Sequence, residues 1–216
     1  FSAEPILFSM DRDINYSNDE AYYIADQLAS LASYLTNDKK FVSFQYYPGS
    51  FAFNSKFILK LCLFNYTSLI IGNENKTVPR YPWHNIPYAP PLNYTAPEYS
   101  NNLLTTSAAD TFSYGALITS LFIGKQFFNF QNEKEIQRAI ATGSFEIPET
   151  IPSDMRGLLQ CCFESDPSRR LTFNEITRFP VFMNLLVRIL REVDSIMKRT
   201  QSERYEFYIR LKKNIS

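Results

Sequence analysis

The chain of 216 residues contains little cysteine and histidine, which limits the covalent and metal-binding chemistry available to it. It has three cysteines, Cys62, Cys161 and Cys162, and one histidine, His84. Two adjacent cysteines in an apolar helical stretch do not build a disulfide framework, and structural zinc sites need four Cys or His ligands in spaced pairs. We therefore expect free, buried thiols in a reducing compartment, no metal site, and an ordinary loop position for His84.

Long apolar runs and an excess of one charge are missing as well. No segment approaches the ~18 uncharged apolar residues of a membrane-spanning helix, and no secretory signal opens the chain. The 22 basic residues balance the 22 acidic ones, so no global charge attracts nucleic acid. Because 45% of the residues are hydrophobic, the chain can bury a core. We expect a cytoplasmic globular protein with no transmembrane segment and no nucleic-acid partner.

Hydrophobic spacing predicts an α+β chain that is mostly helical and has a small β element near its start. Prolines between positions 79 and 91 exclude a helix from the second half of residues 65–95, and a loop of this length is usually functional. The elements predicted before this loop are a strand over residues 1–8 ending in a turn at Glu4-Pro5, a helix capped by Asn18 or Asp19 and stopped at Asn37-Asp38, and strands at 51–53 and 57–61.

The segment 108–123 differs from the other predicted helices. Residues 111–123 contain no charged residue, and their apolar side chains lie on every side of the helix. A helix that is apolar all round is buried all round, so this segment is predicted to be the central helix of the domain. Further helices are predicted over residues 133–141, 154–163, 173–177, 181–199 and 202–213.

Three short motifs surround this central helix. Ala96-Pro97-Glu98 closes the long loop, Asp110 opens the helix, and Asp166-Pro167-Ser168-Arg169-Arg170 precedes a later helix. In this order and spacing, the motifs resemble the C-lobe of the protein kinase family. The resemblance implies a buried ion pair between Glu98 and Arg170, and hydrogen bonds from the backbone of the catalytic loop to Asp110.

The kinase resemblance also implies a domain organisation. Residues 1–180 are expected to form a protein-kinase-like domain from the hinge strand through the C-lobe. Residues 181–216 are expected to form a helical extension, the start of helical repeats. The chain begins with Phe1 in what is predicted to be the middle of a strand, so that the N-lobe is expected to be absent from this sequence.

The catalytic positions implied by the resemblance do not carry the residues that phosphoryl transfer needs. That chemistry uses one carboxylate to position the substrate hydroxyl, another to hold magnesium, and an Asn for the second metal ion. No Asp occurs between Lys39 and Ala109, and the Glu residues there are Glu74 and Glu98. The family positions are held instead by Ser43, Phe44 and Gln45 in the first triplet, Ser50 at the Asn position, and Leu63, Phe64 and Asn65 in the second triplet.

These substitutions remove the groups needed for phosphoryl transfer, while residues expected to support the fold are kept. Neither Gln45 nor Leu63 can take a proton or bind a hard cation as a carboxylate would. Phe44 replaces the Arg that grips a phosphorylated activation loop in the family, and Phe64 is expected as an apolar plug in the core. The expected remnant of the hinge and nucleotide pocket consists of Glu4, Pro5, Phe51 and Phe53. We therefore expect a pseudokinase with no catalytic residues and no cofactor. The alternatives are a divergent active ATP-dependent Ser/Thr protein kinase and a pseudokinase that regulates another partner allosterically.

A narrower resemblance lies in the opening and in the long loop. The opening Phe-Ser-Ala-Glu-Pro-Ile, and a proline-rich loop that contains Trp83 and ends in Asn93-Tyr94-Thr95-Ala96-Pro97-Glu98-Tyr99, are similar to the coated-vesicle-associated branch of the Scy-like pseudokinases. This similarity implies a scaffold that binds clathrin- or COPI-type coat components in Golgi or endosomal traffic, with peripheral membrane association.

The C-terminal residues carry an apolar stripe and an excess of positive charge. The stripe is expected to pack on the lobe or on the next helix, with a docking face for a partner as the alternative. Residues 188–213 contain 8 basic and 4 acidic residues, a net charge of +4 that favours an anionic surface. We predict a partner surface that includes Trp83, Arg199 and Arg204. The stripe consists of Leu185, Leu186, Ile189, Leu190, Val193, Ile196 and Met197.

Overall fold

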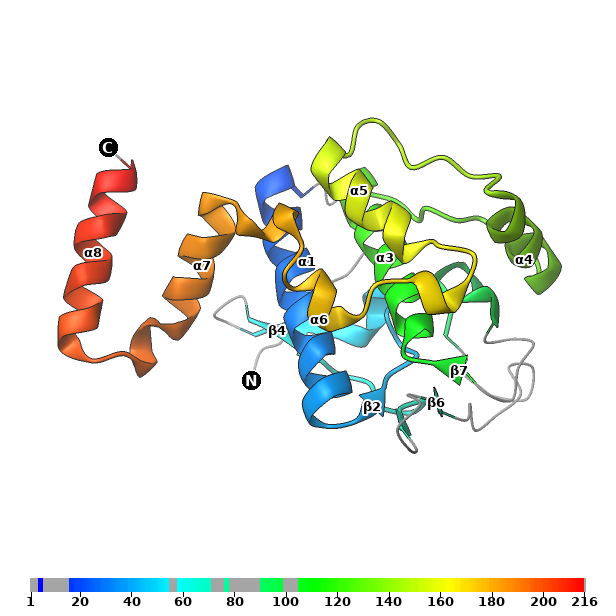
Figure 1. Ribbon diagram of the computed structural model, residues 1–216, viewed down its shortest axis with the longest axis horizontal. Helices are drawn as coiled ribbons and strands as arrows, with labels where there is room; N and C mark the ends of the chain where they lie inside the picture. The colour runs from blue at the N-terminus through cyan, green and yellow to red at the C-terminus, as the bar shows by residue number, and fades with distance from the viewer. Residues whose placement is uncertain are drawn as a thin grey trace.

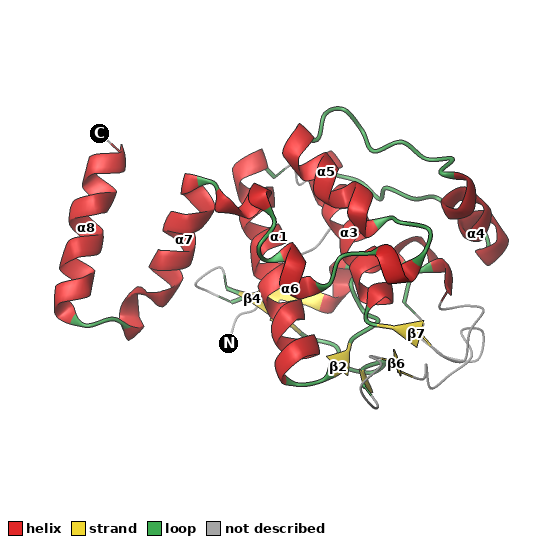
Figure 2. Cartoon of the chain, in the orientation of Figure 1, coloured by secondary structure: helices red, strands yellow, loops and turns green. Residues whose placement is uncertain are grey.

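The computed structural model describes residues 4–5, 16–54, 58–70, 76–77, 90–98 and 105–215. Trp83 and His84 lie outside these residues. The described chain is mostly helical with three small sheets, and a pair of C-terminal helices extends from the helical body (Figures 1 and 2). This agrees with the predicted α+β class. Within the described segments, none of the helices has the length and apolar character needed to cross a membrane.

Helix α1 (Asn18–Ser33) begins at a capping box. The Ser17 hydroxyl accepts a hydrogen bond from the Glu20 N–H, and the Glu20 carboxylate accepts one from the Ser17 N–H at 2.8 Å. These bonds satisfy N–H groups that the first turn leaves without helical partners, which fixes the start of the helix. The predicted cap at Asn18 or Asp19 was therefore wrong by one or two residues. The helix continues into the π-helical turn η1 (Tyr34–Asp38), which ends at the predicted stop.

The largest sheet joins three short antiparallel strands in the order β1 (Glu4–Pro5), β3 (Phe51–Phe53) and β4 (Leu59–Leu61). Glu4 pairs with Phe53, and Phe51 pairs with Leu61. The prediction of a turn at Glu4-Pro5 was wrong, because these two residues are themselves the strand. The Asn54 side chain supports the β3–β4 connection by accepting a hydrogen bond from the Ile58 N–H at 3.0 Å.

Two further sheets were not predicted. Strand β2 (Phe41–Val42) pairs with β5 (Ser68–Leu69), and β6 (Lys76–Thr77) pairs with β7 (Thr105–Thr106), both antiparallel. Each strand contains two residues, which is too short for an alternating hydrophobic pattern to appear in the sequence. Pairing β2 with β5 brings together the two ends of residues 41–69, the stretch that contains both triplets named in the sequence analysis.

Helix α3 (Ala108–Ile123) is the central helix and has the predicted bounds. Every side chain from Ala109 to Leu121 is buried, so the all-round apolar pattern correctly predicted its position. Some of its hydroxyl groups are satisfied within the helix: Thr119 and Ser120 donate to the carbonyl oxygens four residues earlier, both at 2.8 Å. The Tyr114 hydroxyl donates to the Ala25 carbonyl at 3.0 Å and so joins α3 to α1.

Close packing of α3 on α5 (Ser153–Cys162) depends on Gly115. A Cβ at this position would lie 2.8 Å from the Cβ of Cys162 and 3.1 Å from the Phe163 ring, closer than side chains approach. Cys162 is buried and free, and burial raises the pKa of its thiol, whereas Cys161 is only half-buried. Phe163 packs in an aromatic cluster whose other members are Phe112, Phe127, Phe128 and Phe145.

The remaining elements follow the predicted order. The single helix expected over 181–199 is instead interrupted, because the Asn184 side chain accepts a hydrogen bond from the Val187 N–H at 2.8 Å and starts a new helix there. The elements are η2 (Pro48–Ser50), η4 (Leu92–Tyr94), α4 (Glu133–Thr142), η5 (Pro167–Arg169), α6 (Phe173–Ile176), η6 (Pro180–Met183), α7 (Leu185–Ser195), η7 (Ile196–Lys198) and α8 (Gln201–Ile215).

Helix α7 is fixed to α1 by charged and polar contacts. The Arg191 guanidinium forms an ion pair with Asp26, whose side chain is 3% exposed, and its Nε donates to Asp26 Oδ2 at 2.8 Å. The Tyr23 hydroxyl donates to the Asp194 carboxylate at 2.8 Å. Val187, on the same face of α7, is fully buried in the core. The hydrophobic core therefore continues past residue 180 into α7.

Candidate functional site

Residues 43–50 form the loop that the kinase resemblance assigns to catalysis, and Asp110 holds this loop in place. The Asp110 carboxylate accepts hydrogen bonds from the backbone N–H groups of Ser43 and Phe44, each at 2.7 Å. Phe44 has a φ of 59°, a left-handed conformation that is unfavourable for a bulky residue. The predicted hydrogen bonds to Asp110 are thus present, and they fasten the loop where its backbone is strained.

The carboxyl group of Asp110 is 1% exposed, and burial is the dominant influence on its titration. Desolvation raises its pKa to about 7, while the hydrogen bonds from Ser43 and Phe44 act in the opposite direction. Both carboxylate oxygens accept bonds from the loop backbone, so the group acts on the loop and is not presented to a substrate.

The three polar residues at the implied catalytic positions are buried. The exposed fractions are 1% for Ser43 and 0% for both Gln45 and Ser50. Within the part of the chain that the structure describes, neither atom of the Gln45 amide has a hydrogen-bond partner, nor does either serine hydroxyl. At the position that the resemblance assigns to the catalytic base, this chain has a neutral amide with 0% exposure.

Tyr46, the next residue, anchors the loop in the core. Its ring stacks on Phe173 with a centroid distance of 5.7 Å and packs against Phe51 at 5.6 Å. Burial, followed by the nearby charge of Asp110, raises the pKa of the Tyr46 hydroxyl well above its ordinary value. The phenol therefore stays protonated at physiological pH.

The second triplet, Leu63-Phe64-Asn65, lies in the connection between β4 and β5. Phe64 is 55% exposed, so the prediction that it plugs the core was wrong. The reason is a turn in which the Thr67 N–H donates to the Phe64 carbonyl at 3.2 Å and Tyr66 is turned inward, with 8% exposure. Leu63 is half-buried and Asn65 is exposed. Across the described ranges, no group of three or more His, Cys, Asp or Glu side chains is placed to hold a metal ion.

The hinge positions also have defined places in the structure. Glu4 and Pro5 form the edge strand β1 beside β3. Phe51 of β3 is 1% exposed, and Phe53 is partly buried against the same core. The sheet therefore borders the loop that carries Ser50, which directly precedes Phe51.

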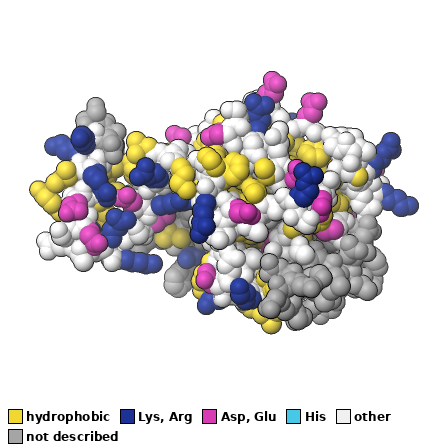
Figure 3. All heavy atoms as spheres, in the orientation of Figure 1, with side chains coloured by type: hydrophobic (Ala, Val, Ile, Leu, Met, Phe, Trp, Pro, Cys, Tyr) yellow, Lys and Arg dark blue, Asp and Glu magenta, His cyan; other side chains and the backbone are white. Residues whose placement is uncertain are grey.

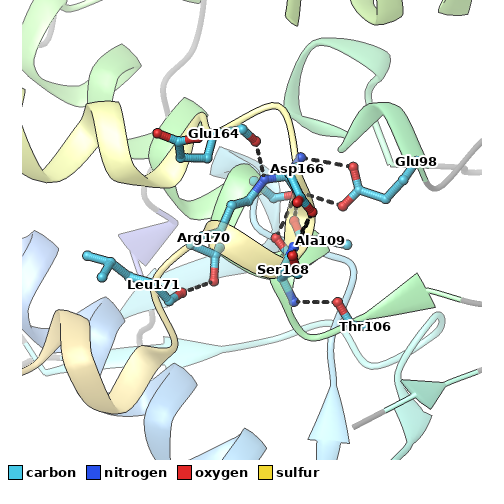
Figure 4. A network of polar contacts seen from close by, with 11 residues as sticks. Glu98, Thr106, Ala109, Glu164, Asp166, Ser168, Arg170 and Leu171 are labelled. Carbon is cyan, nitrogen blue, oxygen red and sulfur yellow. Dashed lines mark hydrogen bonds and ion pairs between the residues drawn. The ribbon is translucent and has the colours of Figure 1, made fainter. Parts of the chain in front are cut away.

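Glu98 and Arg170 form the ion pair expected from the resemblance (Figure 4). Arg170 Nη1 lies 2.6 Å from Glu98 Oε1, and Nη2 donates to Oε2 at 3.1 Å, so the contact is bidentate. The Arg170 side chain is 0% exposed and that of Glu98 is 13% exposed. Arg170 Nε donates to the Glu164 carbonyl at 2.8 Å, and Nη1 also donates to the Ala108 carbonyl at 3.1 Å. Ala96 and Pro97, which precede Glu98, are buried.

This pair links three distant parts of the fold. Glu98 ends the long loop, Ala108 begins α3, and Arg170 follows the turn η5, in which Asp166 accepts a hydrogen bond from the Ser168 N–H at 2.9 Å. The guanidinium carbon also lies 5.2 Å from the centroid of the Phe112 ring, within range of a cation–π interaction. The three motifs singled out in the sequence therefore meet at one buried arginine.

The expected partner residues in the tail have structural contacts. Arg199 Nη1 lies 3.6 Å from a Glu192 carboxylate oxygen, and Arg204 Nε donates to the Arg199 carbonyl at 3.1 Å. Both arginines therefore stabilise the turn between α7 and α8. The third expected residue, Trp83, is outside the described residues.

The sequence argument missed the Asp26–Arg191 pair that fixes α7. A signal was present, because Asp26 lies between Ala25 and Leu28 on the apolar face of α1, where a carboxylate needs a partner. Nothing in the sequence identified Arg191 as that partner, since 165 residues separate the two.

Comparisons with known proteins place these observations in a family. The family model described as "Protein kinase domain" matches residues 60–182, more than half of the chain. The chain is 26% identical over 196 residues to the protein kinase domain-containing protein ppk32 of Schizosaccharomyces pombe, an alignment that covers 85% of this chain and 25% of that protein.

Two further relatives show the same partial coverage. The serine/threonine-protein kinase ppk21 of Schizosaccharomyces pombe is 23% identical over 138 residues, 64% of this chain and 25% of that protein. Human Tribbles homolog 1 is 35% identical over 95 residues, 43% of this chain and 26% of that protein. The chain thus spans about a quarter of the length of these relatives. By the match of more than half its length, the chain belongs to the protein kinase domain family.

Proposed function

We propose that this chain is the C-lobe of a pseudokinase, a kinase-like domain that acts by binding and does not transfer phosphate. The observation that carries the proposal is Gln45, a neutral side chain with 0% exposure at the position of the catalytic base. Phosphoryl transfer needs a carboxylate there to position the attacking hydroxyl. An amide cannot accept the proton at neutral pH, and a substrate cannot reach a group that is fully enclosed.

The carboxylates elsewhere in the region support the same proposal. Between Lys39 and Ala109, the sequence contains no Asp and two Glu residues, Glu74 and Glu98. Glu98 is held by Arg170 in the bidentate pair. Asp110, just beyond this stretch, accepts two hydrogen bonds from the loop backbone. The hydrogen bonds that hold the loop at residues 43–50 are present, while a carboxylate on that loop that could act on a substrate is not.

The finer part of the proposal is a scaffold of the Scy-like type on coated vesicles, with partners among coat components and peripheral association with Golgi or endosomal membranes. Its support is the resemblance in the opening residues and in the proline-rich loop that ends at Tyr99. The alignment with ppk32 over 85% of this chain supports the kinase-like domain on which this finer proposal depends.

An activity measurement tests the absence of catalysis. The full-length protein that contains this chain is incubated with magnesium and radiolabelled ATP, with and without a general protein substrate. We expect no phosphate transfer above that of a Gln45→Ala variant, because loss of a general base alone reduces rates by ~10²–10⁴. Transfer that the Gln45→Ala substitution abolishes would show an active kinase that uses this position.

The rival function is that of a divergent Ser/Thr protein kinase. It is favoured by the similarity to ppk21, which is named a serine/threonine-protein kinase. The same measurement separates the two functions. A Ser50→Ala variant adds a second test, because Ser50 takes the place of the metal-binding Asn and should matter only if the loop performs chemistry. In the pseudokinase, neither substitution changes the background rate.

A further inference from the structure

Helices α7 and α8 form a hairpin with an open groove between them. The groove is lined by Leu185 and Ile189 from α7 and by Phe207 and Leu211 from α8, with Arg188, Glu192 and Arg210 along its sides. Its cavity volume is about 80 Å³. Since one water needs ~10–15 Å³ on this measure, the groove has room for the heavy atoms of an aliphatic side chain. We refer to it as the α7–α8 groove.

One wall of the groove is fixed in advance. The opposite face of α7 packs on α1 through Val187, the Asp26–Arg191 ion pair and the Tyr23–Asp194 hydrogen bond. These contacts hold α7 in place while leaving Leu185 52% exposed. A partner that enters the groove would not need to order this wall, which lowers the cost of binding.

The charge around the groove is positive. Glu192 is compensated on both sides, with Arg210 at 2.9 Å and Arg199 at 3.6 Å. Arg188 is exposed and has no carboxylate partner among the described residues. On the part of the surface formed by these two helices, Lys and Arg side chains lie among hydrophobic ones, together with some Asp and Glu side chains (Figure 3). An occupant with acidic residues beside an apolar stripe would therefore match the α7–α8 groove.

We propose that the α7–α8 groove binds the apolar face of an acidic amphipathic helix from a protein partner. This inference rests on the proposed binding function and specifies the chemistry of its partner. An amphipathic helix presents apolar side chains at i, i+3, i+4 and i+7, which suits a groove between two helices, and its acidic flanks would approach Arg188.

Two other occupants fit less well. A second copy of this chain would bring two positively charged rims together, which is repulsive. A lipid bilayer needs an apolar surface that can lie flat on it, whereas Phe207, at the base of the groove, is only 3% exposed. Both remain measurable outcomes of the experiment.

A designed peptide tests the proposal directly. The probe is a fluorescein-labelled 18-residue helix of leucine and glutamate with the leucines on one face, and its counterpart has lysine at every glutamate position. Fluorescence anisotropy is measured on the full chain. We expect the glutamate peptide to bind and the lysine peptide to bind at least ~10-fold more weakly, with an affinity that falls as salt is added.

Matched substitutions locate the binding site. Leu185→Ser is compared with Leu69→Ser, because the two leucines have similar exposures of 52% and 49%. Arg188→Glu is compared with Arg178→Glu, since both arginines are exposed. We expect each groove variant to weaken peptide binding by ~10-fold and each control to leave it unchanged. Melting curves confirm that all four variants are folded, as is expected for exposed positions.

Several results would overturn the proposal. They are the absence of binding at about 1 mM chain, equal binding of both peptides, and equal losses in the groove variants and their controls. Self-association in sedimentation analysis that Arg188→Glu abolishes would identify a second copy as the occupant. Binding to phosphatidylserine vesicles that the same variant abolishes, without competition by the peptide, would identify a membrane. None of these results depends on phosphate transfer, so the pseudokinase proposal fails or succeeds separately.

Discussion

Removal of the Arg170 side chain tests whether the three sequence motifs form one structural unit. The guanidinium is 0% exposed and donates to Glu98, to the Glu164 carbonyl and to the Ala108 carbonyl. Arg170→Ala would leave the Glu98 carboxylate, 13% exposed, without its arginine partner and would remove one hydrogen bond from each of two backbone carbonyls. Breaking a buried ion pair by removing one member costs ~3–5 kcal/mol, because a desolvated charge is left uncompensated.

That loss is large compared with the stability of a domain. Folded domains are stable by ~5–15 kcal/mol, so the substitution would remove a third or more of the total in a domain of middling stability. For chains of this size, each kcal/mol lowers the melting temperature by ~2–4 °C, which gives an expected decrease of roughly 6–20 °C. The neighbouring Arg169 is a matched control, since its side chain is 70% exposed and its contact with Glu164 is long, at 3.7 Å.

Urea unfolding of both variants supplies the measurement. Arg169→Ala is expected to change the free energy of unfolding by no more than ~0.5 kcal/mol, as exposed substitutions usually do. A double-mutant cycle with Glu98→Ala then isolates the pair, and a coupling energy of at least ~1 kcal/mol is expected for groups in direct contact. Equal and small effects of the two alanine variants would refute the reasoning, because the buried pair would then not support the fold.

Three other substitutions test the anchors of the loop, the central packing and the attachment of α7. Burial raises the pKa of Asp110 to about 7 from 3.8, so the folded state binds its proton more tightly than the unfolded chain. The contribution of Asp110 to the free energy of unfolding should therefore be greatest below pH ~4 and decline as the pH rises to about 7. In urea unfolding from pH 4 to 8, an Asp110→Asn variant should lack this dependence of stability on pH. Gly115→Ala should destabilise the fold by ~1–3 kcal/mol through overpacking. In the control Gly157→Ala, the new Cβ would meet nothing within 4 Å, so the free energy of unfolding should stay the same or rise by up to ~1 kcal/mol. A greater loss of stability in Gly157→Ala than in Gly115→Ala would contradict the close approach of α3 and α5. Arg191→Ala should leave the buried Asp26 carboxylate without its ion-pair partner and increase amide hydrogen exchange in α7. Unchanged protection of that helix would show that its apolar contacts alone hold it on the lobe.

The elements that could be predicted from sequence are those whose signal is local. Helix α3 was predicted to the residue from its charge-free, all-round apolar segment. In the structure the helix ends at Gly124, which has a φ of 68° and closes it in the left-handed conformation. The order of the motifs that end at Arg170 was equally informative, since each motif is a short run of consecutive residues. Their meeting in space followed from the family resemblance and not from any pattern within one motif.

The features that could not be predicted depend on contacts between distant residues or on one turn. The two-residue strands such as β2 have no periodicity, so pairing alone defines them. Whether Phe64 or Tyr66 enters the core is decided by the turn between them, and the sequence offers two aromatic residues of similar size for one place. The face of α7 that packs on the lobe was also unexpected, because the partly exposed Arg191 reaches the buried Asp26 there while the apolar Leu185 remains exposed.

The energetic roles of these groups bear on the proposed pseudokinase, because the anchors of a kinase C-lobe stabilise the fold independently of its chemistry. Removing Arg170 leaves the Glu98 carboxylate without its partner, and removing Asp110 takes away the hydrogen bonds that hold Phe44 at an unfavourable φ. Both side chains therefore contribute to stability whether or not the domain is an enzyme. A carboxylate at position 45 would contribute nothing comparable. In this enclosed site it would be a desolvated charge, and a neutral amide costs less to bury. Where catalysis is not required, physical chemistry thus favours a neutral residue at position 45 and still favours Asp110, which holds the loop backbone. Gln45, with 0% exposure, beside an Asp110 that holds the loop backbone fits this arrangement and supports the proposed pseudokinase, since a kinase active site needs an accessible acid.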